Sequence, residues 1–276
     1  MHMHYLFLSE IGKFKMNYFK FIEEVLAKTA HKTLLEFYKN YNKTDKIEID
    51  IKSDKTPASI ADRQTEKKLR ALIKKQYPDH GIWGEEFGAF KINSEYLWVL
   101  DPLDGTKEFL SKKPNCFGTL IGLMQEKNVV AGAIISPFEN NYILSNKVKR
   151  RNYPIKQLNK MKVACTNPNE MFYECFVESL KNKTDSIITN LNCIGITKLI
   201  KGEVDIFLEN DLSLHDIVPT LPILLNAGIK ALDLEGNSYY ETKFNLGDIS
   251  KKKYGIIATA SEHTAEEILN LYCERL

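Results

Sequence analysis

The segment LDPLDGT concentrates oxygen-bearing groups that could bind a divalent cation. Asp101 ends an apolar run, and Asp104 follows after a proline that fixes φ and turns the chain rigidly. The carbonyl of Leu103 lies between the two carboxylates in sequence. Gly105 lets the backbone approach a ligand closely, and Thr106 adds a hydroxyl. Carboxylates, a carbonyl and a hydroxyl with no His or Cys nearby are hard oxygen donors, which suit Mg²⁺.

The same segment could instead close a β-hairpin, because Asp-Gly is a common two-residue turn. The residues that follow, KEFLSKKP, lack the strict alternation of a returning strand. If a helix begins at Lys107, the amides of Gly105 and Thr106 lie at its positive end, where phosphate binds readily. We therefore expect phosphate contacts at Gly105 and Thr106 beside a metal site.

Further acidic positions add to this interpretation, although some have ordinary structural alternatives. Glu85 and Glu86 follow an apolar stretch between glycines, where an exposed loop could also carry them. Ser59-x-x-Asp62 matches a helix capping box. Asp216 precedes an apolar helix and could be a plain N-cap. It is their combined pattern that indicates an acidic site.

The elements that must position these residues alternate between helix and strand, which predicts an α/β fold. A basic, proline-containing connection, KVKRRNYPIKQL, separates the two halves; we interpret its charges as solvated, although they could contact phosphate or nucleic acid. In chain order the expected elements are a helix over 18–41, a strand at 47–51, a helix over 62–77, a strand over 96–100, three meander strands between 116 and 146, a strand at 161–165, a helix over 169–182, a strand from 186, a short helix at 197–202, a strand at 203–209, a helix over 216–227, strands at 229–236 and 254–260, and a helix over 264–276.

Composition limits the function classes. The chain has 276 residues, of which 43% are hydrophobic and 27% charged, as in ordinary globular proteins. Its net charge of +2 gives no signal for nucleic-acid or membrane binding. The five scattered cysteines predict neither a disulfide framework nor a zinc site and favour a cytoplasmic location.

The chain is expected to comprise an extension and two halves. Residues 1–15 contain too short an apolar run for a signal peptide or a membrane span, and we interpret them as an N-terminal extension before Met16. Residues 16–150 form an N-terminal α+β half with the metal and phosphate motif, and residues 151–276 form an α/β half that completes the site.

WVLDPLDGTKEF resembles the first signature of the inositol monophosphatase superfamily of Mg²⁺-dependent, Li⁺-sensitive phosphatases. Gly84-Glu85-Glu86 matches the upstream family motif, and His215-Asp216 falls on the family's Trp-Asp signature. The resemblance runs from about Phe19 to the C-terminus. It is closest to the histidinol-phosphatase branch, through TPASIADRQTEKKLRALIKKQYPDHGIWGEEFG, KPNCFGTLIGL and LSLHDIVPTLPILLNAG. It implies an αβαβα layered sandwich and a possible homodimer.

The resemblance also implies a role for each site residue. Two to three Mg²⁺ ions would bind, and Mn²⁺ could substitute for them. Asp62 and Thr106 would orient and deprotonate the attacking water. The catalytic residues implied are Asp62, Thr106 and Glu85; the ligands of the first ion are Glu85, Asp101 and the carbonyl of Leu103, those of the second are Asp101, Asp104 and Asp216, and a third, weaker ion would lie near Glu85 and Asp62.

The substrate that the resemblance favours is L-histidinol phosphate, an intermediate of histidine biosynthesis. Glu209 matches the position from which family members contact the non-phosphate part of the substrate, although it could also be a solvated strand end. Asn192 falls where the histidinol-phosphatase branch usually has Asp, which weakens attraction for a cationic substrate. His215 replaces the family Trp, and Pro222 should kink the helix over 216–227.

Three alternatives remain open. The protein could be an inositol-1-monophosphatase or a 3′(2′),5′-bisphosphate nucleotidase, since DPLDGTKEF is shared with the nucleotidase branch. It could also be a non-catalytic homologue that binds metal or phosphate. The complete set of acidic ligands favours the enzyme.

Overall fold

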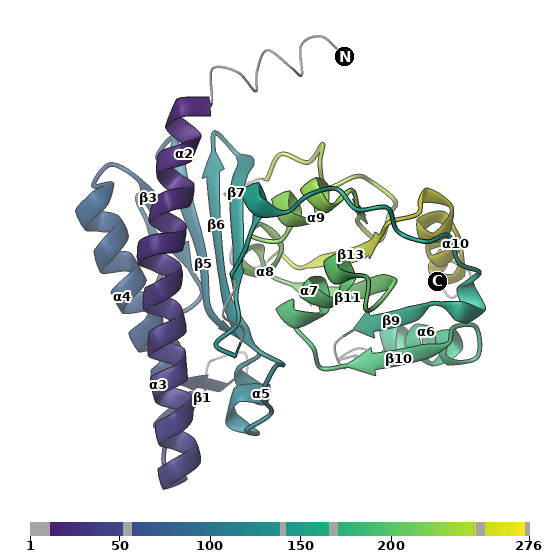
Figure 1. Cartoon of the computed structure of the whole chain (residues 1–276), viewed down its shortest axis with the longest axis horizontal. Coiled ribbons are helices and arrows are strands. Elements are labelled where there is room, and N and C mark those ends of the chain that lie inside the picture. Colours follow the sequence, from purple (N-terminus) through teal and green to yellow (C-terminus); the bar gives the residue numbers. More distant parts are fainter. Residues whose placement is uncertain are drawn as a thin grey trace.

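The computed structural model describes residues 12–51, 57–138, 142–165, 171–244, 246 and 252–273. The two larger β-sheets alternate in space with layers of helices, as Figure 1 shows. This is the predicted αβαβα order. The predicted extension, residues 1–15, lies mostly outside the described residues, and the first helix begins at Gly12.

The larger sheet has six strands in the order β4-β3-β5-β6-β7-β8. β3 and β5 pair in parallel, and the remaining pairs are antiparallel, so the predicted meander after β5 is confirmed. The strands are β3 (Gly81–Gly84), β4 (Gly88–Phe90), β5 (Tyr96–Asp104), β6 (Gly118–Gln125), β7 (Asn128–Ile135) and β8 (Ile143–Leu144).

One face of this sheet is covered by the N-terminal helices. α2 (Gly12–Phe21), the π-helical turn η1 (Ile22–Ala27) and α3 (Lys28–Thr44) follow one another without a break, so the first helix is longer than predicted. It packs with α4 (Ile60–Gln76) on the sheet through a core of buried apolar residues. A small two-stranded sheet, β1 (Ile49–Ile51) with β2 (Pro57–Ser59), leads into α4.

The second sheet has five strands in the order β10-β9-β11-β13-β12. Its strands are β9 (Lys162–Cys165), β10 (Ser186–Thr189), β11 (Ile206–Leu212), β12 (Lys230–Leu232) and β13 (Tyr254–Thr259). The short 3₁₀ turns η2 (Ser145–Lys147) and η3 (Leu158–Lys160) bound the connection between the two sheets, whose basic residues 149–151 are exposed as predicted.

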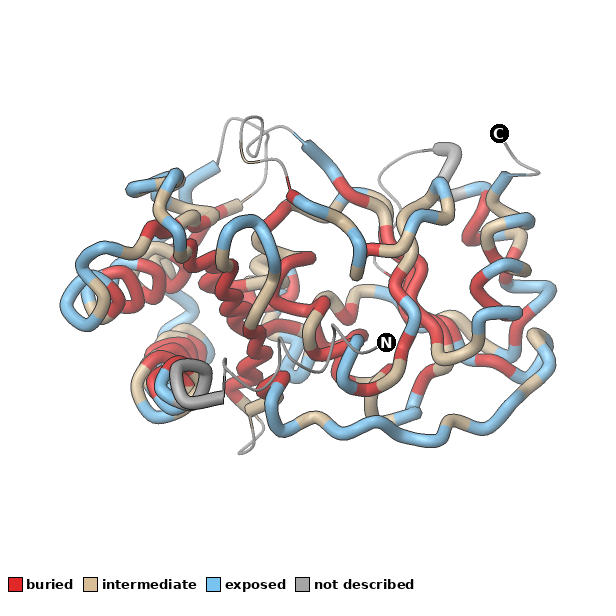
Figure 2. The backbone as a smooth tube through the Cα atoms, turned by 90° about the horizontal axis from the view of Figure 1, so that it is seen from above, coloured by how far each residue is buried: buried red, intermediate tan, exposed pale blue. Residues whose placement is uncertain are grey.

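Three helices fill the space between the sheets: α7 (Cys193–Lys201), α8 (Leu214–Ile217) and α9 (Leu221–Ala227). α6 (Met171–Lys181) and α10 (Glu262–Cys273) cover the outer face of the second sheet. Figure 2 shows buried residues gathered in the strands and on the helix faces turned toward them. Within the described residues, no helix is long and apolar enough to cross a membrane.

Two predicted helices between the sheets have other boundaries in the structure. The helix expected over 216–227 is divided into α8 and α9, because prolines at 219 and 222 cannot supply the N–H groups that a continuous helix needs. The short helix expected at 197–202 begins earlier, at Cys193. Both differences lie in the layer of helices between the two larger sheets.

Candidate metal and phosphate site

Acidic side chains from both halves of the chain meet at the end of β5. Asp101, Asp104 and Asp216 each offer a carboxylate oxygen, and these oxygens lie within 4.8 Å of one another. In a regular strand, residues three apart point to opposite faces. The pairing of β5 with β6 shifts register between Asp101 and Asp104, and this irregularity lets both carboxylates reach one point.

The turn within β5 is held by its own polar groups. The N–H of Leu103 donates to Asp101 Oδ1 at 2.9 Å, and the carbonyl of Pro102 accepts from the hydroxyl of Thr119 at 2.8 Å. A short helix, α5 (Thr106–Leu110), follows Gly105, whose φ is +90°. The alternative of a two-residue Asp-Gly hairpin is therefore wrong.

Thr106 links the turn to the start of α4. Its hydroxyl lies 2.8 Å from Asp62 Oδ1 and 3.0 Å from the carbonyl oxygen of Leu103. The other oxygen of Asp62 accepts from the N–H and the hydroxyl of Ser59, so the predicted capping box is confirmed. Asp62 is fully buried, and burial raises the pKa of its carboxyl above the usual value.

Asp216 is also part of a capping box. The N–H of Ser213 donates to Asp216 Oδ2 at 2.6 Å, which places Asp216 at the third position of α8 and corrects its interpretation as a plain N-cap. In both boxes one carboxylate oxygen serves the helix terminus, and the other remains available to the site.

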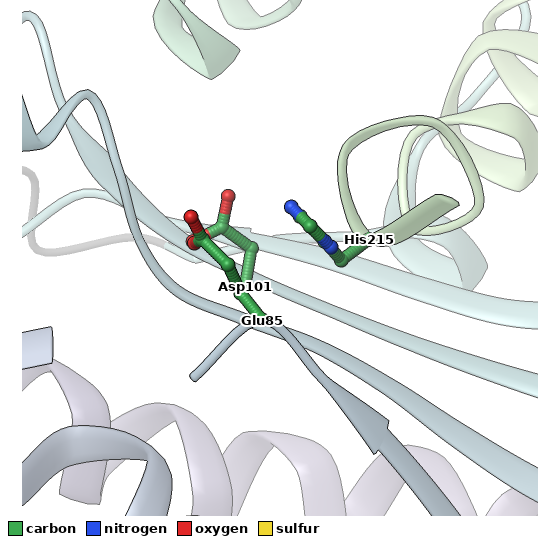
Figure 3. A group of neighbouring side chains, drawn as sticks. All are labelled: Glu85, Asp101 and His215. Atoms are coloured by element: carbon green, nitrogen blue, oxygen red, sulfur yellow. The ribbon is translucent and has the colours of Figure 1, made fainter. Parts of the chain in front are cut away.

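Glu85 reaches the cluster from the end of β3. Its N–H donates to the carbonyl of Leu100 at 3.1 Å, which continues the pairing with β5. A carboxylate oxygen of Glu85, one of Asp101 and a ring nitrogen of His215 lie within 4.8 Å of one another. Figure 3 shows the three side chains turned toward a common space. Among the described residues, Glu86 belongs to no such group of possible ligands.

A buried ion pair that the sequence reasoning missed supports the loop of Glu85. Glu66 is fully buried, and Arg70 Nε lies 2.6 Å from its carboxylate. The same carboxylate accepts from the N–H of Glu86 at 2.7 Å and of Phe87 at 3.2 Å. A Cβ at Gly84 would lie 2.1 Å from it, so only glycine fits there. A signal was present: 62, 66 and 70 form a polar i, i+4 row on the buried face of α4.

Both residues expected to contact substrate lie beside the cluster. Asn192 and Glu209 line a small cavity together with Asp104 and Asp216. Glu209 is buried, whereas the amide of Asn192 donates to Glu108 Oε2 at 3.0 Å and to the carbonyl of Cys116 at 2.8 Å. The remaining wall of the cavity is mostly apolar: Leu120, Cys193, Ile196, Phe207, Leu212, Thr220 and Ile256.

A model of the inositol monophosphatase family matches residues 16–275. The chain belongs to this family. Its members are phosphoric monoester hydrolases and generally use Mg²⁺. The fold agrees: the chain superimposes on an inositol monophosphatase from Thermotoga maritima with a TM-score of 0.76, at 21% identity, over 94% of this chain and 98% of the other.

Two curated relatives show how far the similarity extends. The chain is 28% identical over 246 residues to the bifunctional phosphatase IMPL2 of Arabidopsis thaliana, across 84% of this chain and 68% of that protein. It is 33% identical over 112 residues to a histidinol-phosphatase of Chlorobaculum parvum, across 41% of each chain. Both relatives are phosphatases, but together they do not identify one substrate.

The charges of the cluster fit the divalent cation that this family generally uses. Burial, with the neighbouring carboxylates Glu85, Asp104 and Asp216, raises the pKa of Asp101 well above its usual value. Burial and Asp216 raise the pKa of Asp104 to about 7. Among the described residues, no lysine or arginine pairs with Asp101 or Asp104. Buried like charges of this kind require a cation to remain ionised together.

Proposed function

We propose that the protein is a Mg²⁺-dependent phosphomonoesterase that hydrolyses L-histidinol phosphate to L-histidinol and inorganic phosphate, in the cytoplasm. The observation that carries the phosphatase proposal is the convergence of Asp101, Asp104 and Asp216 within 4.8 Å, next to the hydrogen-bonded pair Thr106 and Asp62. Phosphate-ester hydrolysis needs positive charge beside the phosphoryl oxygens and an activated water. The carboxylates could hold cations that supply the charge, and Thr106 with Asp62 could activate the water.

In this proposal the acidic residues divide into two positions that share Asp101. Glu85, Asp101 and the carbonyl of Leu103 would hold a first cation, and Asp101, Asp104 and Asp216 a second; a weaker position would lie near Glu85 and Asp62. Cations bound there would supply the positive charge that offsets the phosphoryl oxygens. The amides of Gly105 and Thr106, at the start of α5, are suited to donate to phosphate oxygens.

Thr106 and Asp62 are suited to position and deprotonate the attacking water. The Thr106 hydroxyl can donate to Asp62 Oδ1 and use its free lone pair to accept from water. Ser59 donates twice to the other oxygen of Asp62, which keeps the carboxylate oriented. A proton can then pass from water through Thr106 to Asp62 without exposing the carboxylate to solvent.

The cavity beside the cluster favours a substrate that is partly apolar and carries a positive charge. Glu209 is a buried carboxylate that could pair with the ammonium group of L-histidinol phosphate. Phe207 and Ile256 offer an apolar surface to a planar imidazole ring. Asn192 contributes no charge, so Glu209 would carry most of the attraction.

The proposal is tested by measuring phosphate release from L-histidinol phosphate, inositol 1-phosphate and adenosine 3′,5′-bisphosphate with excess Mg²⁺. We expect the highest kcat/KM for histidinol phosphate and loss of most activity with every substrate in Asp104→Asn. Glu209→Gln should raise KM for histidinol phosphate more than for inositol 1-phosphate. Preference for either other substrate would refute the histidinol assignment, and failure of all three would refute the phosphatase proposal.

A further inference from the structure

His215 is a histidine that lies beside carboxylates able to bind a metal ion. It lies in the first turn of α8, directly before Asp216, and its ring faces Glu85 and Asp101 (Figure 3). One ring nitrogen and a carboxylate oxygen from each of those two residues lie within 4.8 Å of one another. The family signature has Trp at this position, and an indole offers no lone pair to a metal.

Among the described residues, the imidazole of His215 makes no hydrogen bond that would turn it away from the cluster. Among the described residues, its Nδ1 is buried and has no partner. Its Nε2 lies 3.6 Å from Asp216 Oδ1, which is longer than a good hydrogen bond. The side chain is 14% exposed, so packing holds the ring against the cluster. A buried imidazole without hydrogen-bond partners can turn a nitrogen lone pair to a cation at little cost.

We infer that His215 supplies a nitrogen ligand to the position formed by Glu85 and Asp101, and that this position takes a divalent transition metal such as Mn²⁺ or Co²⁺ in preference to Mg²⁺. Imidazole nitrogen suits transition metals, whereas Mg²⁺ prefers oxygen ligands. In the part of the chain that the structure describes, the second position is formed by carboxylate oxygens of Asp101, Asp104 and Asp216. The two positions would therefore differ in metal preference, an inference that rests on the proposed metal-dependent function.

Pulsed electron paramagnetic resonance on the Mn²⁺-loaded full chain tests this directly, without an activity readout. We expect a nitrogen coupling to Mn²⁺ that changes from ¹⁴N to ¹⁵N frequencies when only the histidines are labelled with ¹⁵N. The coupling should vanish in His215→Gln and persist in His263→Gln, a matched control at an exposed position of α10. Because the labelled wild-type protein gives the main result, the test does not depend on the variant folding.

Metal titration gives a second, independent measurement. We expect His215→Gln to weaken Mn²⁺ binding about tenfold at one of two positions while changing Mg²⁺ binding less than about threefold. Mn²⁺ that binds without histidine coupling would overturn the role of His215 and leave the proposed phosphatase intact. A chain that binds neither Mn²⁺ nor Mg²⁺ would overturn both proposals.

Discussion

The two capping boxes at the site use the same local motif in opposite electrostatic surroundings. At the start of α4, Asp62 is fully buried and accepts from Ser59 and Thr106, so hydrogen-bond donors surround it. At the start of α8, Asp216 accepts a hydrogen bond from the N–H of Ser213 but faces other carboxylates. The donors around Asp62 offset part of the cost of burying its carboxylate, whereas carboxylates that face one another need a cation to remain ionised together. The neighbours therefore decide which carboxylate orients water and which binds metal.

The largest effect should come from removing the charge that faces the other carboxylates. We expect Asp216→Asn to lower kcat/KM about 10⁴-fold and to weaken Mg²⁺ binding markedly, because the second position loses one of three carboxylates. Phosphate release and titration calorimetry measure the two effects. Asp211→Asn, at an exposed residue of β11, is the matched control and should change neither. Unchanged Mg²⁺ binding in Asp216→Asn would contradict the metal role.

Asp62→Asn should separate catalysis from metal binding. We expect kcat to fall about 10²- to 10³-fold, because the Thr106 hydroxyl would lose its proton acceptor. Affinity for the first two Mg²⁺ ions should stay within about threefold of wild type, since Asp62 is not among the carboxylates of either position. A loss of Mg²⁺ affinity as large as that in Asp216→Asn would make the two capping boxes equivalent and refute the comparison.

Much of this arrangement was predictable because its signals are local. LDPLDGT carries its turn, ligands and hydroxyl in seven residues, and Ser59-x-x-Asp62 specifies its own cap. The order of helices and strands was enough to predict an α/β fold, and the family resemblance implied the layered sandwich. These features depend on residues adjacent in sequence or one helical turn apart.

What sequence reasoning missed depends on which surfaces pack together. The polar row at 66 and 70 on α4 has meaning only because β3 ends beside it, where Glu66 accepts from two backbone amides. The division between α8 and α9 required knowing that two prolines act together rather than one bending the helix. The direction of the His215 ring depends on where α8 meets the larger sheet. Spacing along the chain marks the polar row on α4, but it does not say which element packs against that row.

The electrostatic contrast also predicts how pH acts on the metal-free protein. The pKa of Asp104 is raised to about 7, so the folded state binds this proton more tightly than the unfolded state does. The unfolding free energy should therefore fall as pH rises from about 4 to about 7 and should level off above that range. We expect a melting temperature roughly 5 °C higher at pH 5 than at pH 8 without metal.

Excess Mg²⁺ at pH 8 should restore that stability, because the cation replaces the protons between the carboxylates. Calorimetric scans with and without a chelator measure both effects. Asp104→Asn should reduce the pH difference, which separates the cluster from other titrating groups. Metal-free protein that becomes more stable as pH rises would show that repulsion at this cluster is not significant.

The smallest effect is expected for the two serines that begin the capping boxes, Ser59 and Ser213. Ser59 is fully buried, and its hydroxyl accepts from the N–H of Ala61 and donates to Asp62, so Ser59→Ala should lower the unfolding free energy by about 1–2 kcal/mol. Ser213 is only partly buried and begins a helix of four residues, so Ser213→Ala should cost about 0.5 kcal/mol. Urea titrations of metal-free protein measure this difference.

If donors stabilise Asp62 as an anion, Ser59→Ala should also lower kcat while Ser213→Ala leaves kcat within about twofold, since the N–H of Ser213 still holds Asp216. Equal losses from the two substitutions would mean that the caps serve helix stability alone.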